Sequence, residues 1–197
     1  TLLKRSGLAL AAPSANPHKA LSPTSAGQVM ASLKGKIAAV LDGGDCSLGI
    51  ESTIVDLTAN PPCILRAGPL TASQLSATLG CTVTQPQQHD KAVPGNMAVH
   101  YQPRTPLYIK TAAEIHQHTD YPVVRLAFDH SPAATEKTAT LTRLMPTEKA
   151  AYARLLYRAL FEADQLNADA IWLQQPPQEE AWVDIHDRLN RANTKTQ

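Results

Sequence analysis

The sequence contains little of what would place it at once in a functional class. Its 197 residues include only 3 cysteines, 9 glycines and 5% aromatic residues, so the core must be built mainly from aliphatic side chains. Cys46, Cys63 and Cys81 form no CxxC pair, which indicates neither a disulfide framework nor a cysteine metal site. Reduced thiols are typical of a cytoplasmic protein, and we expect that location. No apolar run approaches the roughly 18–20 residues that a membrane-spanning helix needs.

An excess of charge of one sign is also missing. Lys and Arg number 18 and Asp and Glu 17, which leaves a net charge of +1. Proteins that bind nucleic acid over a broad surface carry a clear excess of basic residues, so we expect weak or no direct tRNA or other RNA binding. An anionic ligand would have to be held by a local site. Hydrophobic residues make up 43%, which excludes a disordered chain.

Several catalytic and nucleotide-binding signatures are absent from the chain. There is no GxxxxGK[ST] loop and no GxGxxG fingerprint. Neither Ser47 nor Ser52 lies in the GxSxG pattern of a hydrolase nucleophile. The histidines, among them His116 and His118, follow no spacing of zinc ligands. A P-loop enzyme, a serine hydrolase and a zinc enzyme are therefore not indicated.

Apolar runs and capping residues predict the local structure of residues 1–81. Ser25 and Thr71 are suitable N-caps, and Gly80 is a suitable helix stop. Short apolar runs bounded by Gly, Pro or Asp read as buried strands. The expected elements are strands at 8–12, 37–41, 52–57 and 63–65, and helices at 25–33 and 71–79.

The remainder of the chain consists of a Pro- and Gln-rich stretch and a regular alternation of elements. Residues 82–105 lack periodicity, which is typical of a linker. The presence of His100 and Tyr101 indicates that this linker docks onto another surface. After it we expect strands at 107–109, 123–128, 140–144 and 170–173, and helices at 147–166 and 179–192. Strands alternating with helices favour an α/β fold with a parallel or mixed sheet.

Small polar side chains follow the first predicted strand. Ser14, Asn16 and Ser22 lie in one loop, where hydroxyls and amides suit phosphate or carboxylate oxygens. The alternative is that these residues only cap ordinary turns. Arg66 follows another strand and is equally compatible with an anion clamp and with a surface ion pair. Glu51, next to Ser52, is either a base or the partner of a cation.

Four strings in this order carry a resemblance to a known family: APSANPHKALSPT, LDGGDCSLGIESTIVDL, ILRAGPLT and PGNMAVHYQPRTPL. With the C-terminal YARLLYRALFEADQLNADAIWLQQPP and HDRLNRA, the chain resembles the YrdC-type threonylcarbamoyl-AMP synthases in their long two-domain form. The resemblance covers essentially the whole chain. It implies the C-terminal portion of a YrdC-like twisted mixed sheet with helices at 1–81, a linker or lid at 82–105, and a small Rossmann-like parallel-sheet α/β domain at 106–197.

This resemblance implies a nucleotidyltransferase that joins L-threonine, bicarbonate and ATP into threonylcarbamoyl-adenylate and releases pyrophosphate. Mg²⁺ would arrive with ATP, and no tightly bound organic cofactor is implied. A downstream tRNA-modifying transferase complex would use the product to modify an adenosine in tRNA. The resemblance assigns ATP binding to Leu10, Ser14, Asn16, Ser22 and Arg66, threonine binding to Ala12 and Ser52, and a lid to His100 and Tyr101; it assigns no residue of this chain to a metal.

Two departures from the family pattern modify that expectation. His18 and Lys19 stand where the family often has Ser-Gly, so this turn should differ in shape. The chain also begins in the middle of the YrdC domain, without the family's basic KxR-type cluster before Thr1. Because charge neutralisation matters greatly in adenylyl transfer, we expect this chain alone to bind ATP weakly and to catalyse little. The alternative function is a non-catalytic RNA-binding or regulatory module, whose tRNA binding would depend steeply on salt.

Overall fold

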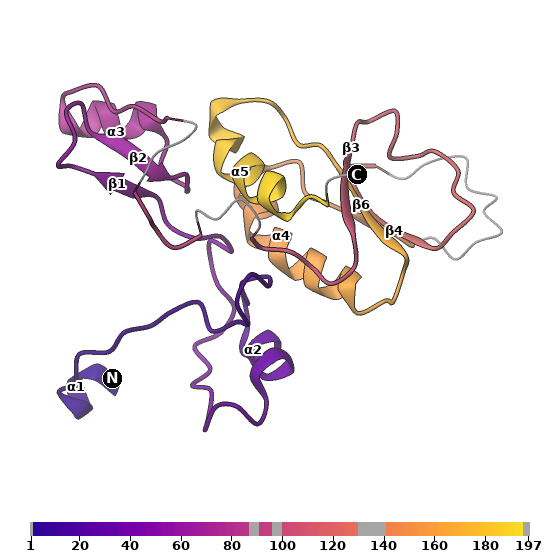
Figure 1. Ribbon diagram of the computed structural model, residues 1–197, viewed down its shortest axis with the longest axis horizontal. Coiled ribbons are helices and arrows are strands. Elements are labelled where there is room, and N and C mark those ends of the chain that lie inside the picture. Colours follow the sequence, from indigo (N-terminus) through magenta and orange to yellow (C-terminus); the bar gives the residue numbers. More distant parts are fainter. Residues whose placement is uncertain (1, 87–90, 96–99, 130–140, 195–197) are drawn as a thin grey trace.

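The computed structural model describes residues 2–86, 91–95, 100–129 and 141–194 (Figure 1). A small unit of two strands and one helix lies beside a larger α/β domain, and the N-terminal residues run below both. The first part contains α1 (Leu2–Ser6), α2 (Ala26–Leu33), β1 (Ile54–Asp56), β2 (Cys63–Arg66) and α3 (Ala72–Leu79). The larger domain contains β3 (Leu107–Lys110), β4 (Val123–Ala127), β5 (Leu141–Leu144), α4 (Lys149–Asp164), β6 (Ala170–Gln174), a short 3₁₀ turn (Glu180–Trp182) and α5 (Val183–Ala192).

The larger domain is built on a four-stranded parallel sheet in the order β3-β6-β4-β5. Ile171 of β6 pairs with Leu107 on one side and with Val124 on the other, and Val124 in turn pairs with Leu141. Within the described ranges β3, β4 and β5 come first along the chain, and α4, β6 and α5 then alternate. The predicted α/β class with a parallel-sheet C-terminal domain is therefore confirmed.

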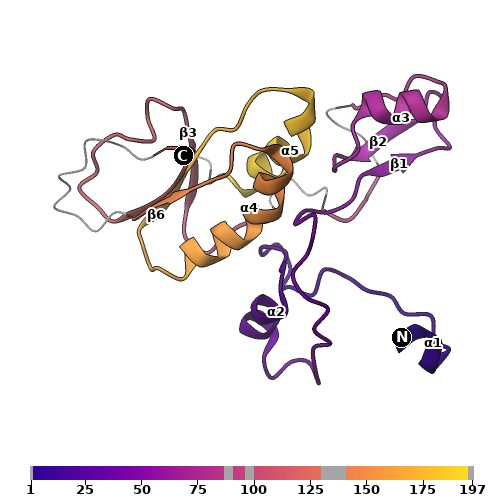
Figure 2. The same cartoon turned by 180° about the vertical axis from the view of Figure 1, so that it is seen from behind.

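Both long helices cover the same face of this sheet, as Figures 1 and 2 show from opposite sides. The period-2 alternation of strands sends Ile171 and Leu173 toward α4 and α5, and Ala170 and Trp172 to the other face. On that second face Ile115 is fully buried against the sheet. The helical face belongs to the main core, which therefore fixes α5 with respect to the sheet.

The small unit of the first part confirms the capping signals. Thr71 accepts a hydrogen bond from the Gln74 backbone N–H, and the Gln74 side chain accepts from the Thr71 backbone N–H, which forms a capping box. Gly80 ends α3 in the left-handed conformation that glycine tolerates best. β1 and β2 pair antiparallel, and Thr84 adds a parallel bridge to Cys63.

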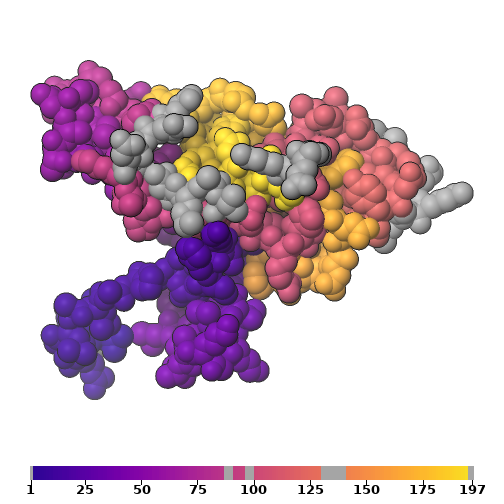
Figure 3. All heavy atoms as spheres, viewed as in Figure 1, coloured from indigo at the N-terminus to yellow at the C-terminus, as the bar shows by residue number. Residues whose placement is uncertain are grey.

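Two of the predicted strands are wrong. Residues 8–12 and 37–41 form no strand, and Leu8, Leu10 and Leu41 are 62%, 55% and 80% exposed. The physical reason is that a strand needs a hydrogen-bonded neighbour, and an apolar run alone does not provide one. Neither segment has a ladder partner within the described part of the chain. In Figure 3 the indigo N-terminal residues project from the body of the molecule.

The two parts nevertheless share one core. Ile50 from the first part and Tyr101 from the predicted linker belong to the same buried cluster as Leu156 and Leu160 of α4. Gly49 packs directly on α4, since a Cβ there would lie within 3.0 Å of the Arg154 backbone. Tyr101 of the linker thus packs in the core that joins the first part to the C-terminal domain.

Candidate active site

All but two of the predicted site residues line one cavity of about 690 Å³. It lies between the loops of the first part and the linker. Its lining includes Ala12, Ser14, Ser22, Ser52, Arg66, His100 and Tyr101, together with Pro13, His18, Glu51, Ile54, Val93, Pro94 and Gly95. Residues that are far apart in the sequence therefore converge on a single concave site, as expected for a ligand pocket.

Leu10 and Asn16 do not line this cavity. The Leu10 side chain is exposed to solvent. The Asn16 amide donates to the carbonyl oxygens of Pro17 and Ala20, both at 3.0 Å, and so closes its own loop. The structure gives Asn16 the turn-forming contacts of the alternative interpretation, and the ATP-binding roles of both residues remain predictions.

Arg66 holds two segments of the cavity wall. Its Nε and Nη2 donate to the backbone oxygen of Ser52 at 3.1 and 2.9 Å, and its Nη1 donates to the carbonyl oxygen of Pro94 at 2.9 Å. Among the described residues it forms no ion pair. The surface ion pair considered from the sequence is therefore not formed there, and the positive charge faces the cavity beside the Ser52 hydroxyl.

Glu51 is the partner of a cation. Its Oε2 accepts from Arg188 Nε at 2.9 Å and from the Tyr157 hydroxyl at 3.0 Å, and its Oε1 accepts from Ser22 Oγ at 2.7 Å. Burial raises the pKa of Glu51, but the Arg188 charge and the hydrogen bonds from Ser22 and Arg188 outweigh burial and hold the pKa below 4.5. Because the carboxylate is ionised and fully engaged, a general base at this position is not supported by the geometry.

The linker closes one side of the cavity. Tyr101 is 1% exposed, adopts a φ of +60°, and stacks on Tyr157 with ring centroids 5.6 Å apart. The backbone N–H of His100 donates to the carbonyl oxygen of Arg191 in α5. Burial lowers the pKa of His100, so its ring favours the neutral form. Both residues line the cavity, and their role as a lid remains a prediction.

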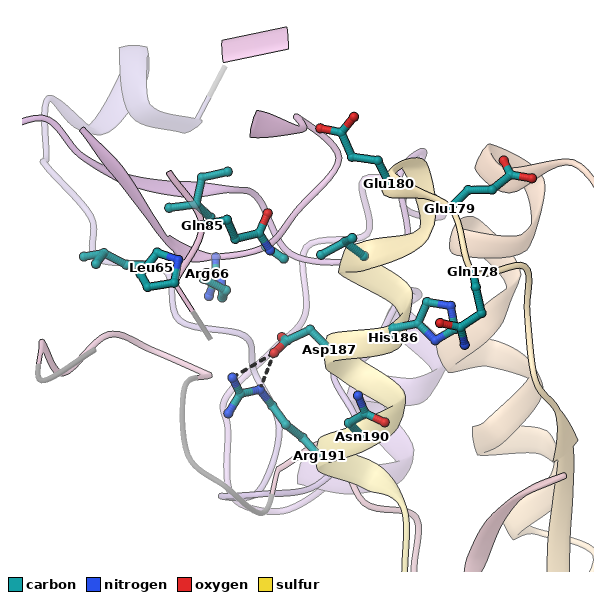
Figure 4. A pocket seen from close by; sticks show the side chains of 14 residues that line it. Leu65, Arg66, Gln85, Gln178, Glu179, Glu180, His186, Asp187, Asn190 and Arg191 are labelled. Atoms are coloured by element: carbon teal, nitrogen blue, oxygen red, sulfur yellow. Dashed lines mark hydrogen bonds and ion pairs between the residues drawn. The ribbon is translucent and has the colours of Figure 1, made fainter. Parts of the chain in front are cut away.

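A second cavity, of about 630 Å³, also has Arg66 in its lining (Figure 4). One wall is β2 with Gln85, and the other is the face of α5 that carries Asp187 and Asn190. Along this face of α5, the Asp187 carboxylate accepts a hydrogen bond from the Arg191 guanidinium. Arg66 lines both cavities, so the site is open toward the C-terminal helix as well as toward the N-terminal loops.

The described side chains do not suit a protein-held metal. No group of three or more His, Cys, Asp or Glu among them is arranged to hold an ion. Glu51 is the one carboxylate among the lining residues of the larger cavity, and its oxygens accept hydrogen bonds from Ser22, Tyr157 and Arg188.

None of the helices in the described ranges is long and apolar enough to cross a membrane.

Tyr157 and Arg188 were missed from the sequence. Both come from the C-terminal domain, and Arg188 lies 137 residues from its partner Glu51. A signal for Arg188 exists, because it falls within the apolar stripe of Ile185, Leu189 and Ala192 on the last helix. A charged residue on the buried face of a helix requires a partner.

Comparisons with known proteins decide the family. Residues 70–194 match the family described as "Threonylcarbamoyl-AMP synthase, C-terminal domain". The chain belongs to the threonylcarbamoyl-AMP synthase family. Residues 1–68 match the family described as "Telomere recombination". The two matches meet near the end of β2, so the candidate site draws residues from both.

Curated relatives support this membership at moderate identity. The threonylcarbamoyl-AMP synthase of Bacillus subtilis (strain 168) is 39% identical over 112 residues, which are 55% of this chain and 32% of the relative. The Pyrococcus abyssi enzyme of that name is 39% identical over 107 residues, 52% of this chain and 32% of the relative. The matched region thus spans about a third of these relatives.

Solved structures extend the likeness to nearly the whole chain. The crystal structure of P. abyssi Sua5 complexed with L-threonine has a TM-score of 0.79 at 26% identity and covers 97% of this chain and 59% of that chain. A variant of the same protein, with adjacent histidine and tyrosine replaced by alanine, gives a TM-score of 0.77 at 25% identity, with 97% and 58% covered. The chain therefore spans somewhat more than half of that structure.

Replacing Glu51 with glutamine should produce a pH-dependent loss of stability. Unfolded Glu51 takes up its proton near its ordinary pKa of 4.5, and folded Glu51 does so only at lower pH. The stabilisation contributed by the ionised Glu51 side chain is therefore complete above its unfolded pKa of 4.5. It is lost as the pH falls through the lower pKa of the folded state. Urea unfolding at a series of pH values should show the wild type losing its advantage over Glu51→Gln as the pH falls.

The Arg188→Met background provides the control for this measurement. Burial is already the largest single influence on the pKa of Glu51, and without the guanidinium its strongest opposing interaction is lost, so we expect the pKa to rise. Lowering the pH should then stabilise Arg188→Met relative to the double variant Arg188→Met with Glu51→Gln. This is the opposite of the trend expected between wild type and Glu51→Gln. An equal gap between wild type and Glu51→Gln at all pH values would contradict the ion pair.

Proposed function

We propose that the protein containing this chain synthesises threonylcarbamoyl-AMP from L-threonine, bicarbonate and ATP and releases pyrophosphate. The observation that carries the proposal is the convergence of Ser14, Ser22, Ser52 and Arg66 on one cavity in a member of this family. The structural relative P. abyssi Sua5 was crystallised in complex with L-threonine, which supports threonine as a substrate here. We further propose that the product serves a tRNA-modifying transferase complex in the cytoplasm.

The chemistry suits a site that positions reactants and carries few ionisable groups. The threonine amine adds to CO₂ derived from bicarbonate and loses a proton, which gives a carbamate. A carbamate oxygen then attacks the α-phosphorus of ATP, the bond from that phosphorus to the bridging oxygen breaks, and pyrophosphate leaves. Orientation and charge stabilisation contribute most of the rate in such transfers.

The chain's own residues can bind and orient these reactants. The Ser14 hydroxyl is a suitable donor to phosphate oxygens, and Ser52 is a suitable contact for threonine. The Ser22 hydroxyl donates to Glu51, so it would have to leave that carboxylate before it could donate to a phosphate. Arg66 supplies positive charge next to Ser52. Mg²⁺ would be held by ATP, since the cavity offers no free carboxylate among its described residues.

Pyrophosphate release tests the proposal directly. The assay uses residues 1–197 and, in parallel, the full natural polypeptide that contains them, with threonine, bicarbonate and ATP omitted in turn. We expect release from the natural polypeptide to require all three. Release that is independent of threonine would overturn the proposal. Binding of tRNA with a steep salt dependence, and no threonine-dependent release, would support the RNA-binding alternative instead.

A further inference from the structure

Arg188 of α5 lies at the junction of four segments behind the candidate site. It is 1% exposed. Its Nε donates to the Glu51 carboxylate at 2.9 Å, its Nη1 donates to the Ala67 carbonyl oxygen at 2.8 Å, and its guanidinium lies 5.4 Å from the ring centroid of Tyr101. A single side chain of the C-terminal domain thus contacts both loops of the first part and the linker.

The three contacts share one property. Each partner of Arg188 is the immediate chain neighbour of another residue that lines the cavity. Glu51 precedes Ser52, Ala67 follows Arg66, and Tyr101 follows His100. A displacement of Arg188 would therefore shift Ser52, Arg66 and His100 together. Arg188 itself is not among the residues that line the larger cavity.

Stability alone is a poor reason for burying this ion pair. Removing two charges from water is costly, and apolar side chains of similar volume often stabilise a fold as well or better. Arg188 nevertheless has its charge balanced by Glu51 and by Asp187, whose Oδ2 accepts from Nη1 at 2.8 Å. The planar guanidinium allows it to hold several acceptors at fixed angles, which a lysine cannot do.

The N-terminus of α4 in the C-terminal domain is already occupied by a side chain of this domain. In a Rossmann-like fold a phosphate commonly binds at the N-terminus of a helix that follows a strand. At α4 this position is taken by the Glu148 carboxylate, which accepts from the backbone N–H groups of Ala150 and Ala151 at 2.8 and 2.7 Å. Tyr157 and Arg188 of this domain both donate to Glu51, and Arg188 also donates to the carbonyl oxygen of Ala67.

We propose that Arg188 is a positioning residue through which the C-terminal domain sets the relative placement of Ser52, Arg66 and the linker for the reaction proposed above. This inference deepens the proposed function and depends on it for its kinetic consequence. The structural consequence is independent of it. Groups that position reactants must be held within about 0.5 Å, so loss of Arg188 should affect turnover more than a comparable loss elsewhere.

Hydrogen exchange separates this role from a general structural one. The variant is Arg188→Met, and the matched control is Lys149→Met. Lys149 of α4 forms a 2.6 Å ion pair with the buried Asp184, which lies on α5 like Arg188, and the control removes this pair. Lys149 lines neither of the two cavities described above. We expect amides at 49–53, 66–68 and 100–102 to exchange at least tenfold faster in Arg188→Met and within twofold of wild type in Lys149→Met.

Kinetics in the full natural polypeptide provide the second readout. At saturating threonine and ATP, kcat should fall at least tenfold in Arg188→Met and stay within twofold of wild type in Lys149→Met. Arg188→Lys, which keeps the charge beside Glu51 but loses the fork, covers the case in which Arg188→Met does not fold. It should protect 49–53 while 66–68 and 100–102 still exchange faster.

The outcomes are distinguishable. Equal effects of Arg188→Met and Lys149→Met on exchange at the three segments would overturn the positioning role. If wild type shows no threonine-dependent pyrophosphate release, the proposed function fails, and the exchange result still decides whether Arg188 orders these segments. Localised faster exchange with unchanged kcat would also overturn the positioning role in the reaction.

Discussion

Replacing Arg66 with alanine should lower kcat/KM for threonine-dependent pyrophosphate release by a factor of about 10²–10³. That range is typical for removing one preorganised donor from a site where negative charge develops. The variant also releases Ser52 and Pro94, whose carbonyl oxygens the guanidinium holds at 2.9 Å each. The measurement is the initial rate over a range of threonine concentrations in the full natural polypeptide.

Two further variants make this result specific. Arg66→Lys keeps the charge but cannot reach both carbonyl oxygens with one planar group, so its activity should lie between wild type and Arg66→Ala. Arg104→Ala removes an exposed arginine that pairs with Asp164 outside the cavity, and its activity should remain within about twofold of wild type. If Arg66→Ala retained more than about a third of the wild-type activity, an important contribution from its charge would be excluded.

Local signals predicted much of the fold correctly. Thr71 and Gly80 were predicted to end α3 and do so, because caps act through neighbouring backbone groups and can be identified in a short stretch of sequence. Alternation of strands and helices predicted a parallel or mixed sheet, and the family resemblance implied the parallel one that is found. The failed strands at 8–12 and 37–41 show the limit of this approach, since burial depends on a neighbour that the segment itself does not encode.

The candidate site shows the same division between local and distant information. The family resemblance assigned Ser52 to threonine and Arg66 to ATP, and both residues line the cavity. The residues alone left Arg66 open between an anion clamp and a surface ion pair. The role of Glu51 was left open, since its partners are Tyr157 and Arg188, 106 and 137 residues away. Periodicity identifies the buried face of a helix, but it does not identify the segment that packs on it.

Tyr101 gives the clearest expected effect on stability. The ring is 1% exposed, stacks on Tyr157 and lies over the Arg188 guanidinium, so it joins the linker to the C-terminal domain. Truncating a fully buried aromatic side chain to alanine costs about 3–5 kcal/mol, and we expect Tyr101→Ala to lower the free energy of unfolding by that amount. Urea denaturation measures the change.

The phenylalanine variant separates ring packing from the hydroxyl. Tyr101→Phe keeps the stacking on Tyr157 and the contact with Arg188, so it should lose less than about half of what Tyr101→Ala loses. Because Tyr101 packs against Arg188, combining Tyr101→Ala with Arg188→Met should cost less than the sum of the two single losses. Strict additivity would mean that the linker and the Glu51–Arg188 pair are held independently, and the cavity wall would then consist of separate parts with no common support.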